Sequence, residues 1–230
     1  MLPVIAWGVG WIVTAVIGGI GVGLAGAVLY QLVMNKWKGK RVAVLGARAV
    51  GKTTFLSFLT TGSIPENYEE TLYSTECDGR RFQLKDLQLR IKDSFDVGGA
   101  KHNICEEWKN EFIESDIVFY LLRADLLMND DSDTVNRVRS DFNIIKDWVD
   151  ELEVKERPTF YIIGTHCDLD ILYSKLPEKN KAAYIDKFQL LPIIVDLRCL
   201  GGVDKVILGS MKTLEYTEAL VYAIFKQVTL

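Results

Sequence analysis

One segment of the sequence has the residue types and the spacing of a phosphate-binding loop. It runs from Gly46 to Thr53 and fits the pattern G-x-x-x-x-G-K-[ST] at every fixed position. In such a loop, backbone N–H groups surround the phosphates, a lysine reaches the β and γ phosphates, and a hydroxyl binds Mg²⁺. We therefore predict that Lys52 contacts the phosphates and that Thr53 is a Mg²⁺ ligand. The predicted nucleotide-binding residues of this loop are Gly46, Ala47, Arg48, Ala49, Val50, Gly51, Lys52, Thr53 and Thr54.

The elements around this loop have the pattern of a parallel α/β fold. Residues 41–45 form a β-branched run that predicts a buried strand, and residues 52–60 predict the helix after the loop. Apolar residues at helical spacing recur over 135–152 and 214–228, and Asp78-Gly79 predicts a turn. Alternating strands and helices predict a doubly wound, mostly parallel six-stranded sheet of the P-loop NTPase class. The further predicted strands are 74–77, 87–95, 116–122, 159–164 and 191–197.

The overall composition excludes several classes of function. The chain has 230 residues, with 27 Lys and Arg against 31 Asp and Glu, a net charge of −4. This balance gives no sign of nucleic-acid binding. The four cysteines, Cys77, Cys105, Cys167 and Cys199, lie far apart, which argues against a disulfide scaffold or a zinc site and favours a reducing cytosolic setting.

The N-terminal segment predicts a membrane anchor. No charged residue occurs from Leu2 to Met34, and about 20 apolar residues are enough to span a bilayer as a helix. Basic residues follow the run instead of preceding it, which favours a retained helix over a cleaved signal peptide. We therefore predict a single-pass transmembrane anchor over residues 1–35, a basic linker over 36–40, and a GTPase-like domain over 41–230. Positive residues concentrate on the cytoplasmic side, so the domain is expected to face the cytoplasm.

Small residues recur every four positions in the predicted anchor. They are Ala15, Gly19, Gly23 and Ala27, and such a stripe allows two helices to approach closely in lipid. One interpretation is pairing with a partner's transmembrane helix or with a second copy of this chain. The alternative is that glycine is simply common in membrane helices.

Several motifs behind the phosphate loop resemble those of the Ras-like small GTPases. The segment from Ile64 to Thr71 resembles a Rho-like switch I, and Asp96-Val97-Gly98-Gly99 has the DVGG form of switch II typical of Arf-like members. The resemblance implies that Thr71 binds Mg²⁺ and senses the γ-phosphate. It also implies that Asp96 holds Mg²⁺ through water and that Gly99 contacts the γ-phosphate. GTP or GDP with Mg²⁺ is the implied ligand.

Two further segments match the family's base-recognition loops in order. Thr165-His166-Cys167-Asp168 stands where the family has [NT]-K-x-D, and the Asp168 carboxylate there accepts both N–H groups of the guanine edge. Asp196-Leu197-Arg198 is placed at the family's S-A-K loop. The resemblance thus implies that Thr165, His166, Asp168, Leu197 and Arg198 bind the nucleotide.

The sequence departs from the family at positions that matter for hydrolysis. Ala100 replaces the glutamine that orients the attacking water, and Arg48 is a bulky cation beside the expected γ-phosphate. His102 either positions water in place of that glutamine or is an exposed switch residue. The candidate catalytic residues are Lys52, Thr71 and His102. We expect the protein to have low intrinsic GTP hydrolysis. His166 in place of lysine, and Asp196-Leu197-Arg198 in place of S-A-K, are expected to weaken guanine selectivity or affinity.

Three functions remain open. The leading one is a membrane-anchored guanine-nucleotide switch with slow or assisted hydrolysis, in which GTP orders segments 63–74 and 96–110 to bind an effector or receptor protein. The second is a hydrolysis-deficient pseudo-GTPase scaffold or receptor subunit at the membrane. The third is a glycine-zipper membrane effector gated by nucleotide. A transmembrane helix before an Arf-like domain also resembles the β-subunits of signal recognition particle receptors.

Overall fold

The computed structural model describes residues 40–61, 64, 81–84, 87–91, 108–177, 180–197 and 206–229. Their core is a six-stranded sheet with the order β2-β3-β1-β4-β5-β6. All neighbouring strands are parallel except β2 and β3, which form an antiparallel hairpin at one edge. The predicted α/β class with a mostly parallel sheet is therefore confirmed. The strands are β1 (Arg41–Gly46), β2 (Arg81–Leu84), β3 (Leu87–Ile91), β4 (Ile117–Arg123), β5 (Thr159–Thr165) and β6 (Val206–Leu208).

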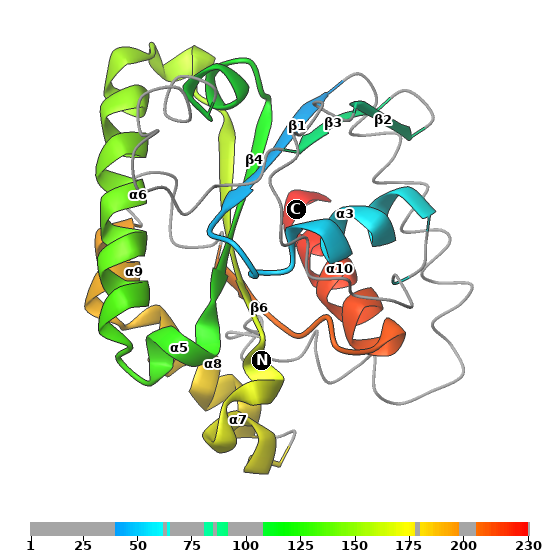
Figure 1. The fold of residues 1–230 in the computed structure, drawn as a ribbon, viewed down its shortest axis with the longest axis vertical. Coiled ribbons are helices and arrows are strands. Elements are labelled where there is room, and N and C mark those ends of the chain that lie inside the picture. The colour runs from blue at the N-terminus through cyan, green and yellow to red at the C-terminus, as the bar shows by residue number, and fades with distance from the viewer. Residues whose placement is uncertain are drawn as a thin grey trace, which may run out of the picture.

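Helices cover both faces of this sheet (Figure 1). The long helix α6, with α8 and α9, packs on one face, whereas α3 and α10 pack on the other. The shorter elements η1, η2, α5 and α7 connect the strands. The helices are α3 (Lys52–Thr61), α5 (Ala124–Met128), α6 (Ser132–Glu151), η1 (Val154–Glu156), η2 (Cys167–Leu169), α7 (Ile171–Lys175), α8 (Lys181–Gln189), α9 (Pro192–Leu197) and α10 (Leu214–Thr229).

The central strands are apolar on both sides because each face of the sheet has its own core. In β1, Val42 and Val44 join the core under α3 and α10, whereas Ala43 and Leu45 join the core under α6. This alternation follows from the two-residue period of a strand. The near-continuous apolar runs in the sequence are thus those of buried parallel strands.

The predicted helix over 135–152 is confirmed as α6, and its start was marked in the sequence. The carboxylate of Asp131 accepts a hydrogen bond from the backbone N–H of Thr134 at 2.9 Å. Such an N-cap satisfies one of the backbone donors that a helix start leaves without an intrahelical acceptor. The first turn of α6 is thereby fixed close to the end of β4.

The predicted strand over residues 191–197 is wrong, because this segment forms helix α9. Pro192 occupies the first helical position, where its fixed φ is favourable and its missing N–H costs nothing. Ile193, Ile194 and Leu197 are buried, whereas Val195 is exposed, which is the one-sided pattern of a helix. The sixth strand lies further along the chain, at Val206–Leu208.

The hairpin at the sheet edge also differs from the prediction. Asp78-Gly79 was expected to be the turn between two strands, but the paired strands are β2 and β3, with Leu84 opposite Leu87. The connection between them therefore comprises only residues 85 and 86. The strand predicted within 87–95 is confirmed as β3, and the one over 74–77 lies outside the described residues.

The predicted anchor over residues 1–35 and its stripe of small residues lie outside the described residues. Within the part of the chain that the structure describes, no helix combines the length and the apolar character needed to cross a membrane.

Candidate functional site

The phosphate-binding loop joins the end of β1 to the start of α3, and its shape depends on glycine. Gly46 has φ 137° and Gly51 has φ 91°, and Ala49 also lies in the left-handed region at φ 60°. A Cβ at Gly46 would overlap the backbone oxygen of Leu121 in the neighbouring strand. The first glycine is therefore required both by its backbone conformation and by its contact with β4.

Lys52 is buried and held against this loop. Its ammonium donates hydrogen bonds to the backbone oxygens of Gly46 at 3.0 Å and Ala47 at 2.7 Å, and the residue is only 4% exposed. Thr53 is exposed and Thr54 is half-buried in the first turn of α3. A buried cation at the N-terminus of a helix, within a loop of this shape, is the chemistry of a phosphate site.

The structure places the first base-motif residue directly against the phosphate loop. The Thr165 hydroxyl is fully buried, and its Oγ1 lies 2.9 Å from the backbone oxygen of Val50 and 3.0 Å from that of Leu122. Thr165 thus joins β5 to both the phosphate loop and β4. This contact spans a long separation in sequence and fixes the two loops relative to each other.

His166 is held by the same hydroxyl. Its Nδ1 lies 2.8 Å from Thr165 Oγ1, and its backbone adopts φ 60°. Because the two carbonyl oxygens can only accept, the Thr165 hydrogen goes to them, and we assign the His166 ring hydrogen to Nδ1. Burial, and then the nearby charge of Arg123, lower the pKa of His166, which favours the neutral ring.

The two residues after His166 differ in their surroundings. Cys167 is buried, and burial raises the pKa of its thiol far above the ordinary range, so it is an inert core residue. Its backbone N–H donates to the Gly209 oxygen at 3.3 Å, which ties the β5 loop to the end of β6. Asp168, by contrast, is partly exposed in η2.

The loop after β6 was missed in the sequence and comprises Gly209 to Lys212. The Gly209 N–H donates to the Gly164 oxygen at 2.9 Å, and the buried Ser210 hydroxyl accepts the Lys212 N–H at 3.1 Å. The Met211 side chain occupies the space where a Cβ of Gly51 would lie. A signal existed in the sequence: Ser-x-Lys follows a short apolar run after a single glycine, Gly209.

Leu197 does not contribute to this edge of the sheet. It was expected in the last base-recognition loop, but it lies in α9 and is buried at 3% exposure in the core beneath α6. Ser210-Met211-Lys212 follows the sixth strand instead. Unlike Leu197, six further residues singled out in the sequence lie outside the described part of the chain: Thr71, Asp96, Gly99, Ala100, His102 and Arg198.

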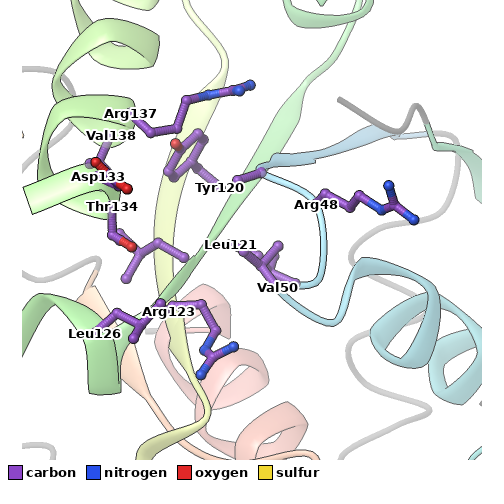
Figure 2. A pocket seen from close by; sticks show the side chains of 12 residues that line it. Arg48, Val50, Tyr120, Leu121, Arg123, Leu126, Asp133, Thr134, Arg137 and Val138 are labelled. Carbon is purple, nitrogen blue, oxygen red and sulfur yellow. The ribbon is translucent and has the colours of Figure 1, made fainter. Parts of the chain in front are cut away.

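A cavity of about 280 Å³ lies between the phosphate loop, the end of β4 and the start of α6. Figure 2 shows Asp133 and Thr134 of α6 on one side of it and Val50 of the loop on the other. The Arg48 side chain extends away from α6 (Figure 2). The cavity is thus lined on one side by Ala47, Arg48 and Val50, the loop residues that precede Lys52.

Tyr120 and Arg137 line this cavity and form a polar triad with Asp141, which is buried. The Tyr120 hydroxyl donates to Asp141 Oδ2 at 2.7 Å, and Arg137 Nε donates to Asp141 Oδ1 at 2.9 Å. Burial raises the pKa of Asp141, although Arg137 opposes this shift. Because each partner satisfies the other, the triad attaches α6 firmly to β4.

Among the described residues, no group of three or more His, Cys, Asp or Glu side chains could hold a metal ion. Of the three predicted Mg²⁺ ligands, only Thr53 is described.

A solved structure supports the fold independently. The small COPII coat GTPase SAR1 of Encephalitozoon cuniculi, an ADP-ribosylation-factor-like GTP-binding protein solved with GDP, superposes with a TM-score of 0.53. The two chains are 16% identical, and the match covers 96% of this chain and 95% of the other. This chain has the fold of the Arf-like small GTPases. In sequence, it matches no protein-family profile and no curated protein.

Proposed function

We propose that this protein is a guanine-nucleotide-binding switch anchored in a membrane by residues 1–35. The observation that carries the proposal is the phosphate loop, in which the buried Lys52 ammonium is bonded to the carbonyls of Gly46 and Ala47. The Arf-like fold, a nucleotide-binding and switch-like architecture, supports it. The sequence motif and the local geometry thus agree.

The nucleotide would lie along the carboxyl edge of the sheet. The phosphates would bind the loop and the N-terminus of α3, with Mg²⁺ on Thr53, Thr71 and, through water, Asp96. The base would meet Thr165, His166 and Asp168, with Ser210-Met211-Lys212 closing the other side. This last segment replaces Leu197 and Arg198 in the proposal because it follows β6.

The switch would act through the two segments expected to contact the γ-phosphate. With GTP bound, Thr71 and Gly99 would hold residues 63–74 and 96–110 in one conformation that binds a partner protein. Loss of the γ-phosphate would release both segments. Because the anchor fixes the location of the protein, nucleotide would control which partner binds.

A second candidate is a scaffold that binds nucleotide but does not hydrolyse it. Ala100 in place of the water-orienting glutamine favours this alternative. The two candidates share one binding site and differ only in turnover. Both predict guanine nucleotide on the purified protein.

The test begins with the full-length chain purified in detergent. Chromatography of the released nucleotide should identify GDP or GTP, and turnover should be slow without a partner. Ala100→Gln should raise turnover if the site is otherwise competent, whereas an unchanged rate favours the scaffold. A chain that carries no nucleotide and ignores added GTP contradicts both candidates.

A further inference from the structure

Arg123 is held in a single position at the end of β4. Its Nε and one terminal nitrogen donate to the two oxygens of Asp125, at 2.7 and 2.5 Å, in a two-bond fork. The Asp125 side chain is 7% exposed and that of Arg123 is 24% exposed. Such a geometry restricts the guanidinium far more than a single surface contact would.

This position is next to the base motif. Arg123 is paired in register with Thr165 across β4 and β5. The preceding residue, Leu122, accepts from the Thr165 hydroxyl, which also contacts His166. Figure 2 shows the Arg123 guanidinium turned away from Asp133 and Thr134 of α6. The cation therefore belongs to the nucleotide edge of the sheet and not to the surface of α6.

The charges around Arg123 agree with this placement. The hydrogen bonds that Arg123 donates to Asp125, and then the charges of Asp125, Asp168 and Asp131, raise the pKa of Arg123. Arg123 in turn helps to lower the pKa of His166, after burial. Arg123 is thus bonded to one carboxylate and lies within the electrostatic influence of two more, and the lowered pKa of His166 favours its neutral ring.

A nucleoside polyphosphate is a polyanion, so a cluster of carboxylates near its site would oppose binding. The base motif carries Asp168 but has His166 where the family has a lysine. We infer that Arg123 is the positioning residue that supplies, from the end of β4, the positive charge that the base motif lacks at His166. Asp125 fixes that charge in place. This inference rests on the proposed function, because it assigns a role at the same site.

The first experiment compares Arg123→Gln with the unaltered full-length chain. The affinity for a fluorescent GDP in Mg²⁺ should fall by about tenfold or more, as expected when a paired charge near a ligand is removed. The matched control is Arg139→Gln, an exposed arginine on α6, which should bind like the unaltered chain. Equal affinity of the Arg123 and Arg139 variants would overturn the inference.

Two double variants separate a charge effect from a purely structural one. Arg123→Gln with Asp125→Asn removes the ion pair without leaving a buried carboxylate unpaired, and its affinity should stay low. Arg123→Gln with His166→Lys restores a cation to the motif, and its affinity should recover. Recovery in the first double variant, or no recovery in the second, would overturn the inference.

A measurement without nucleotide tests the placement of Arg123. Titration of His166 by NMR should give a higher pKa in Arg123→Gln than in the unaltered chain, and an unchanged pKa would overturn the inference. If the unaltered chain does not bind guanine nucleotide, both the inference and the proposed function fail. If it binds and Arg123→Gln binds equally well, only the inference fails.

Discussion

The phosphate end and the base end of the candidate site are built in different ways. At the phosphate end, backbone groups determine the geometry: Gly46 and Gly51 adopt positive φ, and the loop carbonyl oxygens accept hydrogen bonds from Lys52. At the base end side chains dominate, with Thr165 bonding to three groups and Met211 covering Gly51. Glycine alone adopts these backbone conformations without strain, so the phosphate end requires glycine at fixed positions of the sequence. Side-chain contacts, in contrast, can come from several different strands.

The largest expected effect comes from replacing one glycine by alanine at each end of the site, which adds a single methyl group. Gly46→Ala should abolish folding or reduce the free energy of unfolding by more than about 3 kcal/mol, because the new Cβ would overlap the Leu121 backbone oxygen at an unfavourable φ. Denaturant unfolding measures the loss.

Gly209→Ala, in the loop after β6, is the matched variant. Its Cβ would meet the Leu220 side chain at 2.8 Å, and a side chain can move, so the loss should be clearly smaller. An equal loss at both glycines would contradict the distinction between a backbone-built and a side-chain-built end.

The second prediction concerns the cation of the phosphate loop. Lys52→Ala should reduce affinity for GDP and GTP by at least about 100-fold, because it removes the charge that meets the phosphates. Calorimetric titration checks this, and Lys187→Ala, an exposed lysine on α8, is the control. Nucleotide affinity that survives in Lys52→Ala would show that this loop is not the phosphate site.

The third prediction tests the link between the two ends. Thr165→Val keeps the shape of the side chain but removes the hydroxyl that reaches Val50 and Leu122, so the free energy of unfolding should fall by about 1 to 2 kcal/mol. Nucleotide affinity should also fall, because His166 loses its partner.

Thr217→Val is the control for this link. Its buried hydroxyl donates to the backbone oxygen of Thr213, the residue just before α10. That variant should lose comparable stability and retain its nucleotide affinity. A Thr165 variant that loses stability but binds nucleotide normally would mean that the hydroxyl holds the fold and not the site.

The smallest expected change in stability comes from Asp116, which lies at the edge of the sheet opposite the phosphate loop, just before β4. Burial would raise the pKa of Asp116, but the backbone N–H of Arg41 and the Lys40 ammonium lower it below its usual range. Because the folded pKa is lowered, the resulting stability is present above about pH 3.8 and is lost as the pH falls through the folded value.

Asp116→Asn should therefore reduce the free energy of unfolding at pH 7 by less than about 1 kcal/mol, since the pair is largely exposed. The difference from the unaltered chain should narrow as the pH falls below 3.8. Glu156→Gln, an exposed residue in η1, should show neither effect. Nucleotide affinity should not change, because this edge is remote from the loop end of β1.

The same contrast explains what the sequence could predict. The phosphate loop, β1, β4, β5 and helices α6 and α10 were predictable because strict glycine positions, buried runs and long helical periods leave little choice. The run 191–197 was ambiguous, since a short apolar stretch suits a buried strand or helix equally, and Pro192 was the signal that decides. β6 has three residues, too few for a period, so only the Ser-x-Lys that follows it could reveal it.

The base end could be predicted only in part. Thr165, His166 and Asp168 follow a predicted strand directly, which marked them as candidates, but the contact of Thr165 with the phosphate loop emerged only from the structure. Arg123 and Met211 could not be assigned, because their proximity to this motif arises from strand order and packing and not from sequence spacing. A part of the site formed by side chains that are distant in the sequence can be assigned only once the fold is known.

The central claim is that this edge binds a guanine base, and nucleotide competition tests it most directly. Fluorescent GDP bound to the full-length chain is displaced with GDP, ADP and XDP, and the series is repeated with Asp168→Asn. The account predicts displacement by GDP at concentrations at least about tenfold below ADP, and a shift of preference toward XDP in the variant. Equal displacement by GDP and ADP, or an Asp168→Asn variant with unchanged preference, would contradict it.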